Sequence, residues 1–264
     1  MLRSLYSGIS GMKNMQTKLD VIGNNIANVN THGFKKSRIT FKDTTYQTLQ
    51  NAYGPDAGLG GINPKQVGHG SEIAGIDVID TQGSFQSTGR VLDLAVSGVG
   101  VVIVEEGEGN EFFTRAGNFY IDADGYLVTS DGYHVLNPER GRIQVVPEGR
   151  TVENISIDPN GNINVIFSGS TTVEQRGTIG LATFSNPVGL ERVGGNLFRE
   201  TDNSGDANVT DGGGKINSGR LEMSNVDLAE EFTEMIVAQR GFQANTRIIT
   251  TSDEILQELV NLKR

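Results

Sequence analysis

The 264-residue sequence contains no cysteine, no tryptophan and only 6 prolines. The absence of cysteine excludes disulfide bonds, thiolate catalysis and cysteine-based metal sites. It leaves the compartment open, because a cytosolic protein and a secreted bacterial assembly are both compatible with a chain without thiols.

A long hydrophobic run and a cleavable signal peptide are also lacking. Arg3, Lys13, Lys18 and Asp20 interrupt the apolar positions near the N-terminus, and no small-residue cleavage site follows them. No stretch approaches the roughly 18 apolar residues of a membrane-spanning helix. If the protein becomes extracellular, we expect export by a route that leaves its N-terminus intact.

Positive charge is scarce, with 22 Lys and Arg against 32 Asp and Glu and a formal net charge of −10. Residues 1–50 nevertheless hold seven basic and two acidic side chains, so the acidic excess lies in the rest of the chain. A balance this acidic argues against nucleic acid as the main partner. We interpret the basic start as matching an acidic surface of the same protein.

Motifs for catalysis, cofactors and metals are weak or incomplete. His32, His69 and His134 stand singly, without a nucleophile motif or a zinc-binding pair. Gly98-Val99-Gly100 resembles half of a dinucleotide loop, but no helix pattern follows it. Asp122-Ala123-Asp124-Gly125 resembles the start of a calcium loop, but the later acidic ligands are missing. We therefore predict no enzyme activity, no small-molecule substrate, no cofactor and no metal.

Apolar residues at the two ends of the chain follow the period of an α-helix. From Leu2 to Val29 they recur at steps of three and four, and from Leu228 to Leu256 they recur every seven residues. These spacings predict one long amphipathic helix at each end of the chain.

The two predicted helices carry opposite charge. Residues 1–31 hold three basic and one acidic side chain, whereas residues 225–264 hold four basic and seven acidic ones. A shared period and opposite charge predict that the helices pair as a coiled coil. Asn225 or Asp227 would cap the second helix. On period alone, an ordinary helical hairpin closing one globular core is the alternative.

Asparagines crowd the end of the first predicted helix. Asn24, Asn25, Asn28 and Asn30 surround its apolar stripe, although asparagine is a poor helix former. Side-chain amides both donate and accept hydrogen bonds, so these residues could bond a neighbouring subunit and fix its register. A plain helix stop made by Asn30 and Gly33 is the other interpretation.

The paired helices are marginally stable alone, because their linkage spans most of the chain and isolated helices gain little in water. We therefore expect both ends to be mobile until neighbouring copies surround them. Apolar seam residues would bind the assembly and polar ones would set its register. The predicted interface comprises Leu5, Met12, Leu19, Asn25, Ile26, Asn28, Leu228, Met235, Gln239, Phe242, Asn245, Ile249 and Leu256.

The middle of the chain has the pattern of a β-domain. Two Asp-Gly turn signals lie within FYIDADGYLVTSDGYHVL, residues 119–136, and a third turn lies between Asp158 and Gly161. Residues 91–104 and 178–184 add further β-rich runs. We predict an α+β fold with a central, mainly antiparallel β-domain. The expected parts are a helical coiled-coil domain of residues 1–35 and 224–264, extended connectors at 36–84 and 186–223, and a β-domain at 85–185.

Long segments of the sequence resemble the bacterial flagellar rod and hook family. SGISGMKNMQTKLDVIGNNIANVNTHGFKKSR, residues 7–38, is similar to its N-terminal signature, and residues 224–262 are similar to its C-terminal signature. Between them, TGRVLDLAVSGVG and FTRAGNFYIDADGYLVTSDGYHVLN resemble the family's shared β-domain. Val101-Val102 departs from the family pattern, which usually places aromatic residues there.

The resemblance implies a structural subunit of the flagellum rather than an enzyme. Its terminal helices would pair in a core tube, with the β-domains outside. It would polymerise with copies of itself into a helical tube of the basal body and hook, and would contact other axial proteins of the rod, the hook cap and the hook–filament junction. It would leave the cell through the type III export apparatus without a cleaved signal peptide.

Two members of the family are the nearest expectations. Val226-Asp227-Leu228 and Ile236 to Arg240 are closer to hook proteins, whereas the short length, Phe41-Lys42-Asp43 and Tyr46-Gln47 are similar to distal rod proteins. We expect a hook subunit, part of the flexible joint between rod and filament. A distal rod subunit is the alternative, and a coiled-coil adapter or binding module is the remaining one.

Overall fold

The computed structural model describes residues 2–55, 60–107, 109–147, 149–169, 172–209 and 214–262. The chain divides into two compact units, each built from discontinuous segments. The helical unit comprises Met1–Ala27, Ser37–Val78 and Asp227–Arg264, and the β unit comprises Asn28–Lys36 and Ile79–Val226.

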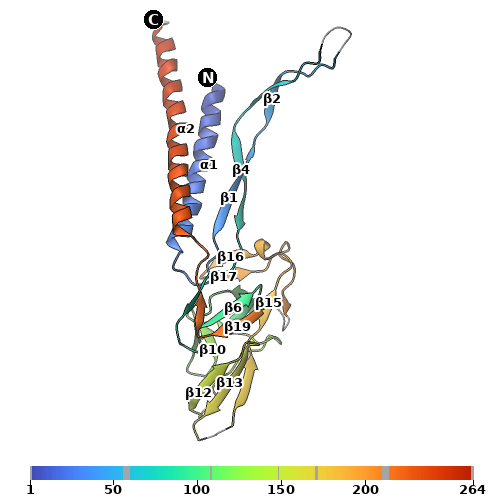
Figure 1. Ribbon diagram of the computed structural model, residues 1–264, viewed down its shortest axis with the longest axis vertical. Helices are drawn as coiled ribbons and strands as arrows, with labels where there is room; N and C mark the ends of the chain where they lie inside the picture. Colours follow the sequence, from blue (N-terminus) through green and yellow to red (C-terminus); the bar gives the residue numbers. More distant parts are fainter. Residues whose placement is uncertain are drawn as a thin grey trace. The chain divides into compact units, whose positions relative to one another are not determined.

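The helical unit contains two long helices and a two-stranded ribbon (Figure 1). The two terminal helices pair with each other, which confirms the prediction that we made from the sequence. In the part of the chain that the structure describes, neither helix is apolar enough over its length to cross a membrane. The elements are α1 (Leu2–Ala27), β1 (Ser37–Asp43), β2 (Tyr46–Gln50), β3 (Lys65–Gly68), β4 (Ser71–Val78) and α2 (Leu228–Leu262).

Asp227 is the N-cap of α2. Its Oδ1 accepts hydrogen bonds from the backbone N–H of Ala229 at 2.8 Å and of Glu230 at 3.4 Å, which satisfies donors that have no partner within the helix. Asn225, the other candidate, bonds within the β unit instead, where its Oδ1 accepts from the backbone N–H of Lys36 at 2.7 Å.

The ribbon replaces part of the connector expected at 36–84. β1 pairs antiparallel with β4, from Ser37 opposite Val78 to Asp43 opposite Ser71, and β2 pairs with β3 farther along. Exposure alternates along β4 in the two-residue period of a strand with one covered face. In the sequence this alternation is short and lies beside turn-forming glycines at residues 54–70, so we predicted a connector there.

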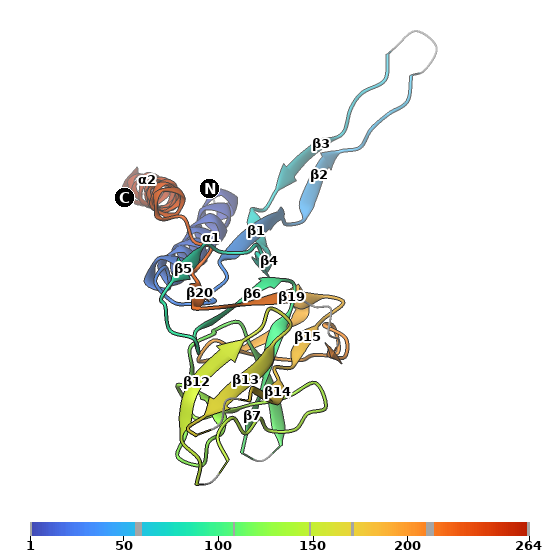
Figure 2. The ribbon, with the colours of Figure 1, turned by 60° about the horizontal axis from the view of Figure 1, so that its bottom comes forward.

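The β unit is built from short antiparallel strands. Figure 2 shows β12, β13 and β14 side by side, with β6 alongside β19. Its elements are β5 (Phe85–Ser87), β6 (Leu94–Gly98), β7 (Val101–Glu106), β8 (Asn110–Thr114), β9 (Phe119–Ile121), β10 (Leu127–Thr129), β11 (His134–Val135), β12 (Val152–Ile157), β13 (Asn162–Phe167), β14 (Glu174–Thr178), β15 (Leu181–Thr183), the 3-10 helix η1 (Pro187–Gly189), β16 (Glu191–Gly194), β17 (Leu197–Arg199), β18 (Asn208–Val209), β19 (Gly214–Ser218) and β20 (Arg220–Glu222).

One mainly antiparallel sheet organises the β unit. Its strand order is β16-β17-β8-β7-β11-β10-β9, and β15 joins β7 to β18. The three predicted turns are confirmed, because β9 pairs with β10, β10 with β11 and β12 with β13. The predicted α+β class is also confirmed.

The β unit extends beyond the limits 85–185 that the sequence indicated. Strands β16 to β20 lie within 186–223, which we expected to be a connector. Leu197 of β17 is buried and pairs with Thr114, while Phe198 pairs with Phe113. These strands are only two to five residues long and are separated by glycines. The alternation of apolar and polar residues within each strand was therefore too brief to indicate a strand.

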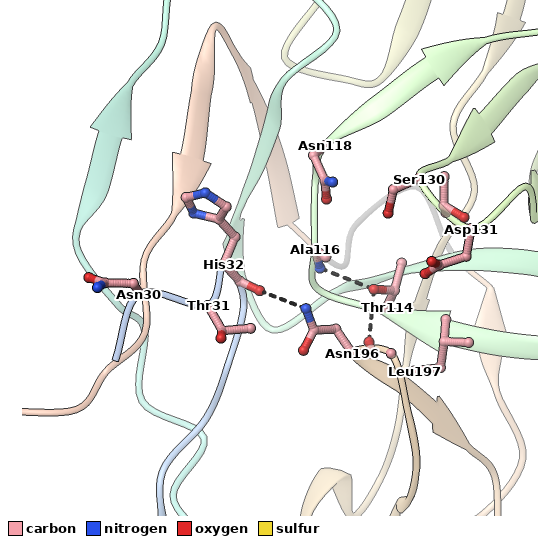
Figure 3. Close-up of a pocket in the computed structure, with 12 residues that line it drawn as sticks. Asn30, Thr31, His32, Thr114, Ala116, Asn118, Ser130, Asp131, Asn196 and Leu197 are labelled. Carbon is pink, nitrogen blue, oxygen red and sulfur yellow. Dashed lines mark hydrogen bonds between the residues drawn. The ribbon is translucent and has the colours of Figure 1, made fainter. Parts of the chain in front are cut away.

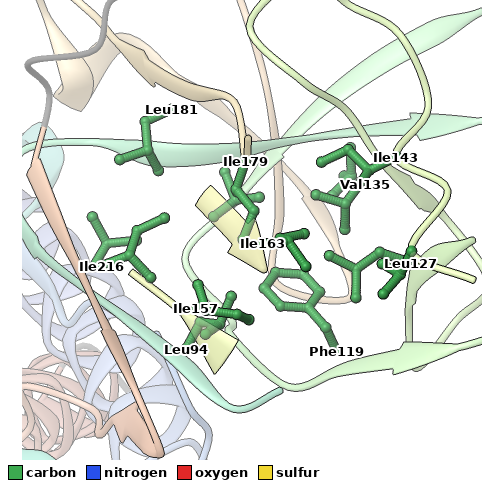
Figure 4. Close-up of a cluster of buried hydrophobic side chains, with 14 of the residues drawn as sticks. Leu94, Phe119, Leu127, Val135, Ile143, Ile157, Ile163, Ile179, Leu181 and Ile216 are labelled. Carbon is green, nitrogen blue, oxygen red and sulfur yellow. The ribbon is translucent and has the colours of Figure 1, made fainter. Parts of the chain in front are cut away.

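Strand β7 lies at the centre of the hydrophobic core. Val102 and Val104 point into the main cluster, whereas Ile103 joins a smaller cluster with Phe113 and Ala182. Both faces of this strand are therefore buried, which explains its continuous apolar run. Figure 4 shows the main cluster, in which residues from separate strands meet, among them Leu94, Phe119, Leu127, Ile163, Leu181 and Ile216.

Candidate assembly surfaces

The seam between α1 and α2 is antiparallel and is close at its glycines. Gly8 lies beside Ile249, and farther along α1 a Cβ added at Gly11 would be 2.9 Å from Asn245 Oδ1. Near the middle of the pair, a Cβ added at Gly241 of α2 would be 3.1 Å from Met15 Sδ. Glycines on both helices thus allow the backbones to approach where a larger residue would hold them apart.

One face of α2 is turned to this seam. Its members repeat at steps of four and three, as in a coiled coil. All are buried or half-buried, although two are polar and one is acidic. They are Glu231, Met235, Ala238, Phe242, Asn245, Ile249, Ser252 and Leu256.

Asn25 joins three elements of the helical unit. Its Nδ2 donates to the carbonyl of Ser37 at 2.9 Å and to Glu231 Oε2 at 3.2 Å, and its Oδ1 accepts from the backbone N–H of Ser37 at 3.0 Å. The side chain is only 2% exposed. The amide of Asn25 therefore fixes α1 against both the first ribbon strand and α2.

A second asparagine on the same side of α1 was missed by the sequence interpretation. Asn14, which is 6% exposed, donates from Nδ2 to Ser71 Oγ at 2.8 Å. It lies eleven residues before Asn25, which is close to three helical turns, so both amides face the ribbon. This spacing was visible in the sequence, but nothing there identified Ser71 as the partner.

Beside the seam, α2 carries apolar side chains that the chain itself covers only in part. Val237, Ile248, Ile255, Leu259 and Leu262 are between 43% and 83% exposed. Ala244 continues the row between the first two. We call Val237, Ala244, Ile248, Ile255, Leu259 and Leu262 the second stripe. Exposed apolar rows of this kind mark interaction surfaces.

Two further exposed apolar groups belong to the helical unit. Leu228, Phe232 and Ile236 follow one another at steps of four in the first turns of α2. The ribbon and its loop expose a second group, namely Phe41, Tyr46, Leu49, Tyr53, Ile62, Val67 and Ile76. Exposed apolar residues on a two-stranded ribbon with unpaired edges favour pairing with another chain.

A buried ionic cluster ties together remote segments of the β unit. Glu222, at the end of β20, accepts from Lys35 Nζ at 2.7 Å and from Arg115 Nε at 2.9 Å. The backbone N–H of Gly83 donates to the same carboxylate at 3.0 Å. Arg115 also donates to the carbonyl of Gly100 at 2.8 Å. All three charged side chains are at most 5% exposed.

The cluster keeps Glu222 ionised. Burial by itself would raise the pKa of this carboxyl, but the charge of Arg115 and the hydrogen bonds from Lys35, Arg115 and Gly83 outweigh burial and lower the pKa below its ordinary value. Residues 28–36 continue from α1 and residues 220–226 lead into α2. The cluster therefore anchors, inside the β unit, both segments that connect directly with the helices.

The structure separates the predicted interface residues into several environments. Leu5, Met12, Leu19 and Ile26 are half-buried on α1, while Leu228 and Gln239 are exposed on α2. Asn28 lies in the β unit, where its Oδ1 accepts from Thr31 Oγ1 at 3.1 Å. Met235, Phe242, Asn245, Ile249 and Leu256 share the seam face with one another. Their contacts with other copies stay a prediction, as do those of Asn25.

Gly33 has a different role from the helix stop considered for it. Helix α1 already ends at Ala27. Gly33 has a φ of 71°, its N–H donates to the carbonyl of Glu222 at 2.9 Å, and an added Cβ would be 2.7 Å from the carbonyl carbon of Arg115. A glycine is needed here because three backbone segments meet.

Three parts of the chain match protein families of the flagellum. Residues 5–35 match the family described as flagella basal body rod protein, residues 95–165 match the flagellar hook protein FlgE/F/G D1 domain, and residues 217–262 match the flagellar basal body rod FlgEFG protein C-terminal family. The segments around both helices and the centre of the β unit are thus covered in the expected order.

Curated relatives extend the match to the whole chain. The flagellar basal-body rod protein FlgG of Bacillus subtilis is 57% identical over 269 residues, covering 100% of both chains. The chain belongs to the flagellar rod and hook protein family. FlgG of Borreliella burgdorferi is 42% identical over 270 residues, and the flagellar hook protein FlgE of the same organism is 33% identical over 451, each with full coverage.

Membership in the flagellar rod and hook family identifies the protein as a structural component of the flagellum and not an enzyme. Among solved structures, the Helicobacter pylori flagellar hook protein FlgE2 matches with 15% identity, 71% coverage of this chain, 43% coverage of that chain and a TM-score of 0.25. A likeness this loose carries no further argument.

Proposed function

We propose that the protein is a subunit of the flagellar rod that polymerises with copies of itself into a tube, the assembly being bound through its terminal helices. The observation that carries this proposal is the second stripe of α2, an apolar row at coiled-coil spacing beside a seam that α1 already occupies. A helix with one apolar face covered and another exposed is suited to pack between helices of neighbouring copies.

The energetics favour ordering on assembly. Burying a Leu, Ile or Val side chain fully contributes about 1.5 to 3 kcal/mol, and the five large members of the second stripe are roughly half exposed in the single chain. Completing their burial would therefore contribute about 4 to 7 kcal/mol per copy. The helical unit gains this contribution only when another copy is present.

We favour a rod subunit over a hook subunit, although the signatures at residues 226–228 and 236–240 indicated a hook protein. The FlgG relatives align over 260 to 271 residues, close to the length of this chain. The hook relatives align over 451 and 473 residues, so they carry long inserts that a 264-residue chain lacks. The hook is the second candidate, supported by identity of 33% to one hook protein.

The remaining partners follow from the same proposal. The subunit would meet other axial proteins at both ends of its tube and would reach the growing tip through the type III export apparatus. We propose that this export leaves α1 intact, because Gly8 and Gly11 of α1 lie on the seam with α2.

Seeded polymerisation tests self-assembly. We expect the purified chain to elongate into filaments visible by electron microscopy, and we expect the double substitution Ile248→Asp with Ile255→Asp to prevent elongation. Gln243→Asp with Thr250→Asp is the matched control, because it has the same seven-residue separation and all four positions are exposed on α2. Circular dichroism should show both variants folded. Normal elongation of the first variant would refute the role of the second stripe.

Complementation separates rod from hook. Cells lacking their own distal rod subunit should regain rods when they produce this chain, whereas cells lacking hook protein should not regain hooks. Cryo-electron tomography of the basal body provides the readout. Restoration of hooks alone would reverse the assignment.

A further inference from the structure

A pocket of about 260 Å³ lies entirely within the β unit (Figure 3). It is lined by the loop that follows α1, by the end of β8 and by the turns after β10 and β16. None of the surfaces discussed above includes it. The residues that matter for its chemistry are Asn30, His32, Asn118, Ser130, Asp131 and Asn196.

Hydrogen bonds hold the floor of the pocket in place. Thr114 Oγ1 donates to the carbonyl of Asn196 at 2.9 Å and accepts from the backbone N–H of Ala116 at 3.1 Å. Asn196 Nδ2 donates in turn to the carbonyl of His32 at 3.4 Å. The backbone of Asn196 has a φ of 60°, a left-handed conformation that the turn imposes on it. The pocket is therefore built before any ligand arrives.

Several polar groups in the pocket are open to a ligand. Ser130 and Asp131 are exposed, and neither they nor Asn118 form a side-chain hydrogen bond or ion pair with another residue that the structure describes. Nδ1 of His32 is buried and also lacks a hydrogen bond. Figure 3 shows Asn118, Ser130 and Asp131 on the same side of the pocket. Unpaired polar groups that converge on one space are suited to bind a polar ligand.

The charge of the pocket selects the ligand class. Among the described lining residues, Asp131 is the one acidic side chain, and none is a lysine or an arginine. The carboxylate, the amide oxygens and the hydroxyl all accept hydrogen bonds, whereas ammonium and guanidinium groups only donate them. No phenylalanine, tyrosine or tryptophan lines the described part of the pocket, which disfavours a typical small-molecule site.

We propose that this pocket receives a lysine or arginine side chain from a second copy of the chain. The inference rests on the proposed self-assembly and names one contact within it. A pocket and a complementary side chain at different places on the same molecule form a head-to-tail contact, which repeats indefinitely in a helical polymer. The volume is sufficient for the end of one long basic side chain.

Three exposed basic side chains outside the helices can supply the contact. Lys65 lies on β3, Lys215 on β19 and Arg220 on β20. None of them forms an ion pair with another residue in the described part of the chain. By contrast, Lys42 pairs with Glu72 at 3.1 Å within the ribbon.

Binding to the single chain is the first test. Nα-acetyl-lysine methylamide and Nα-acetyl-arginine methylamide, titrated at millimolar concentration, should shift the amide NMR signals of Asn118 and Ser130 in a saturable manner. Asp131→Asn should abolish the shifts, whereas Asp124→Asn, at an exposed aspartate of the β9–β10 turn outside the pocket, should not. Absence of saturable shifts in the unmodified protein would overturn the inference, whether or not the protein polymerises.

Assembly is the second test. Asp131→Asn should raise the critical concentration for elongation about tenfold, and Asp131→Lys should raise it further, because one partner of the contact is then lost or repelled. Combining Asp131→Lys with Lys65→Glu, Lys215→Glu or Arg220→Glu should restore elongation for the pair that meets. If no combination restores it, or if Asp131→Asn elongates normally, the inference fails while the proposed function stands. If the unmodified protein binds the lysine derivative but never elongates, the proposed function fails instead.

Discussion

Asn25 of α1 and Glu231 of α2 share a hydrogen bond of 3.2 Å although they are 206 positions apart in the sequence. Both side chains are buried, and Asn25 also bonds the backbone of Ser37 on the ribbon. One amide therefore determines how three remote segments of the helical unit meet.

Asn25→Asp should lower the free energy of unfolding by about 3 kcal/mol or more, because the new carboxylate loses the donor and lies beside Glu231. Chemical denaturation followed by circular dichroism measures the change. Asn24→Asp, the same substitution at an exposed neighbour, should have little effect. Adding Glu231→Gln to Asn25→Asp should recover part of the loss, since a donor then faces the carboxylate. Equal effects at positions 24 and 25 would contradict the role of Asn25.

Two glycines of α1 should respond in opposite directions to alanine. Gly23 has nothing within 4 Å of an added Cβ, so Gly23→Ala should stabilise the helix by about 0.5 to 1 kcal/mol. At Gly11 the added methyl group meets the side chain of Asn245, so Gly11→Ala should destabilise by about 1 kcal/mol. Thermal unfolding distinguishes the two. Asn245→Ala should relieve the effect at Gly11, and stabilisation at both glycines would show that the seam is looser than described.

Gly33→Ala should destabilise the β unit by about 3 kcal/mol or more, because strain at positive φ adds to overlap with the backbone of Arg115. Gly132 provides the matched control. Its φ is 87°, but nothing lies within 4 Å of an added Cβ, so Gly132→Ala should cost only about 1 kcal/mol. Denaturant midpoints measure the stability of both variants. A similar loss of stability in the two would mean that the space around Gly33 accommodates a side chain, which would contradict this prediction.

Acid should weaken the β unit through Glu222. Its pKa in the folded protein is lowered, so its contribution is present above the ordinary carboxyl pKa of about 4.3 and is lost as pH falls through the folded value. Glu222→Gln should remove this part of the pH dependence. At neutral pH it should destabilise by about 3 to 5 kcal/mol, because Arg115 then stays buried without its negative partner and Lys35 keeps only the more distant carboxylate of Asp80, at 3.8 Å.

Unfolding at several pH values between about 3 and 7 tests this prediction across the ordinary titration range of carboxyl groups. Glu191→Gln is the control, because Glu191 pairs with Arg199 on the surface, where both side chains are more than half exposed. Its effect should be below about 1 kcal/mol. If both variants keep the same acid dependence as the unmodified protein, Glu222 does not govern it.

The sequence was sufficient to predict the elements whose signals are local. The helical period of the apolar residues gave both helices, and their shared period and opposite charge gave their pairing. Asn225 or Asp227 was expected to cap α2, and the Asp-Gly turns gave the hairpins at 119–136. Each of these signals depends on residues a few positions apart.

The features that were missed depend on residues far apart. Lys35, Arg115 and Glu222 form one cluster across 187 positions, and a charged residue in a sequence gives no sign that it will be buried. Asn14 likewise finds Ser71 only after the ribbon has folded. The pocket around Asp131 arises from four separate segments, so no local motif could indicate it.

The antiparallel seam brings the beginning of α1 and the end of α2 to the same end of the pair (Figure 1). A chain delivered from its N-terminus, whether by a ribosome or through a narrow channel, presents α1 first and must wait for the whole β unit before the matching surface emerges. The helical unit is therefore completed only after α2 has emerged. A truncated subunit that lacks α2 cannot form the helix pair, however well its strands fold.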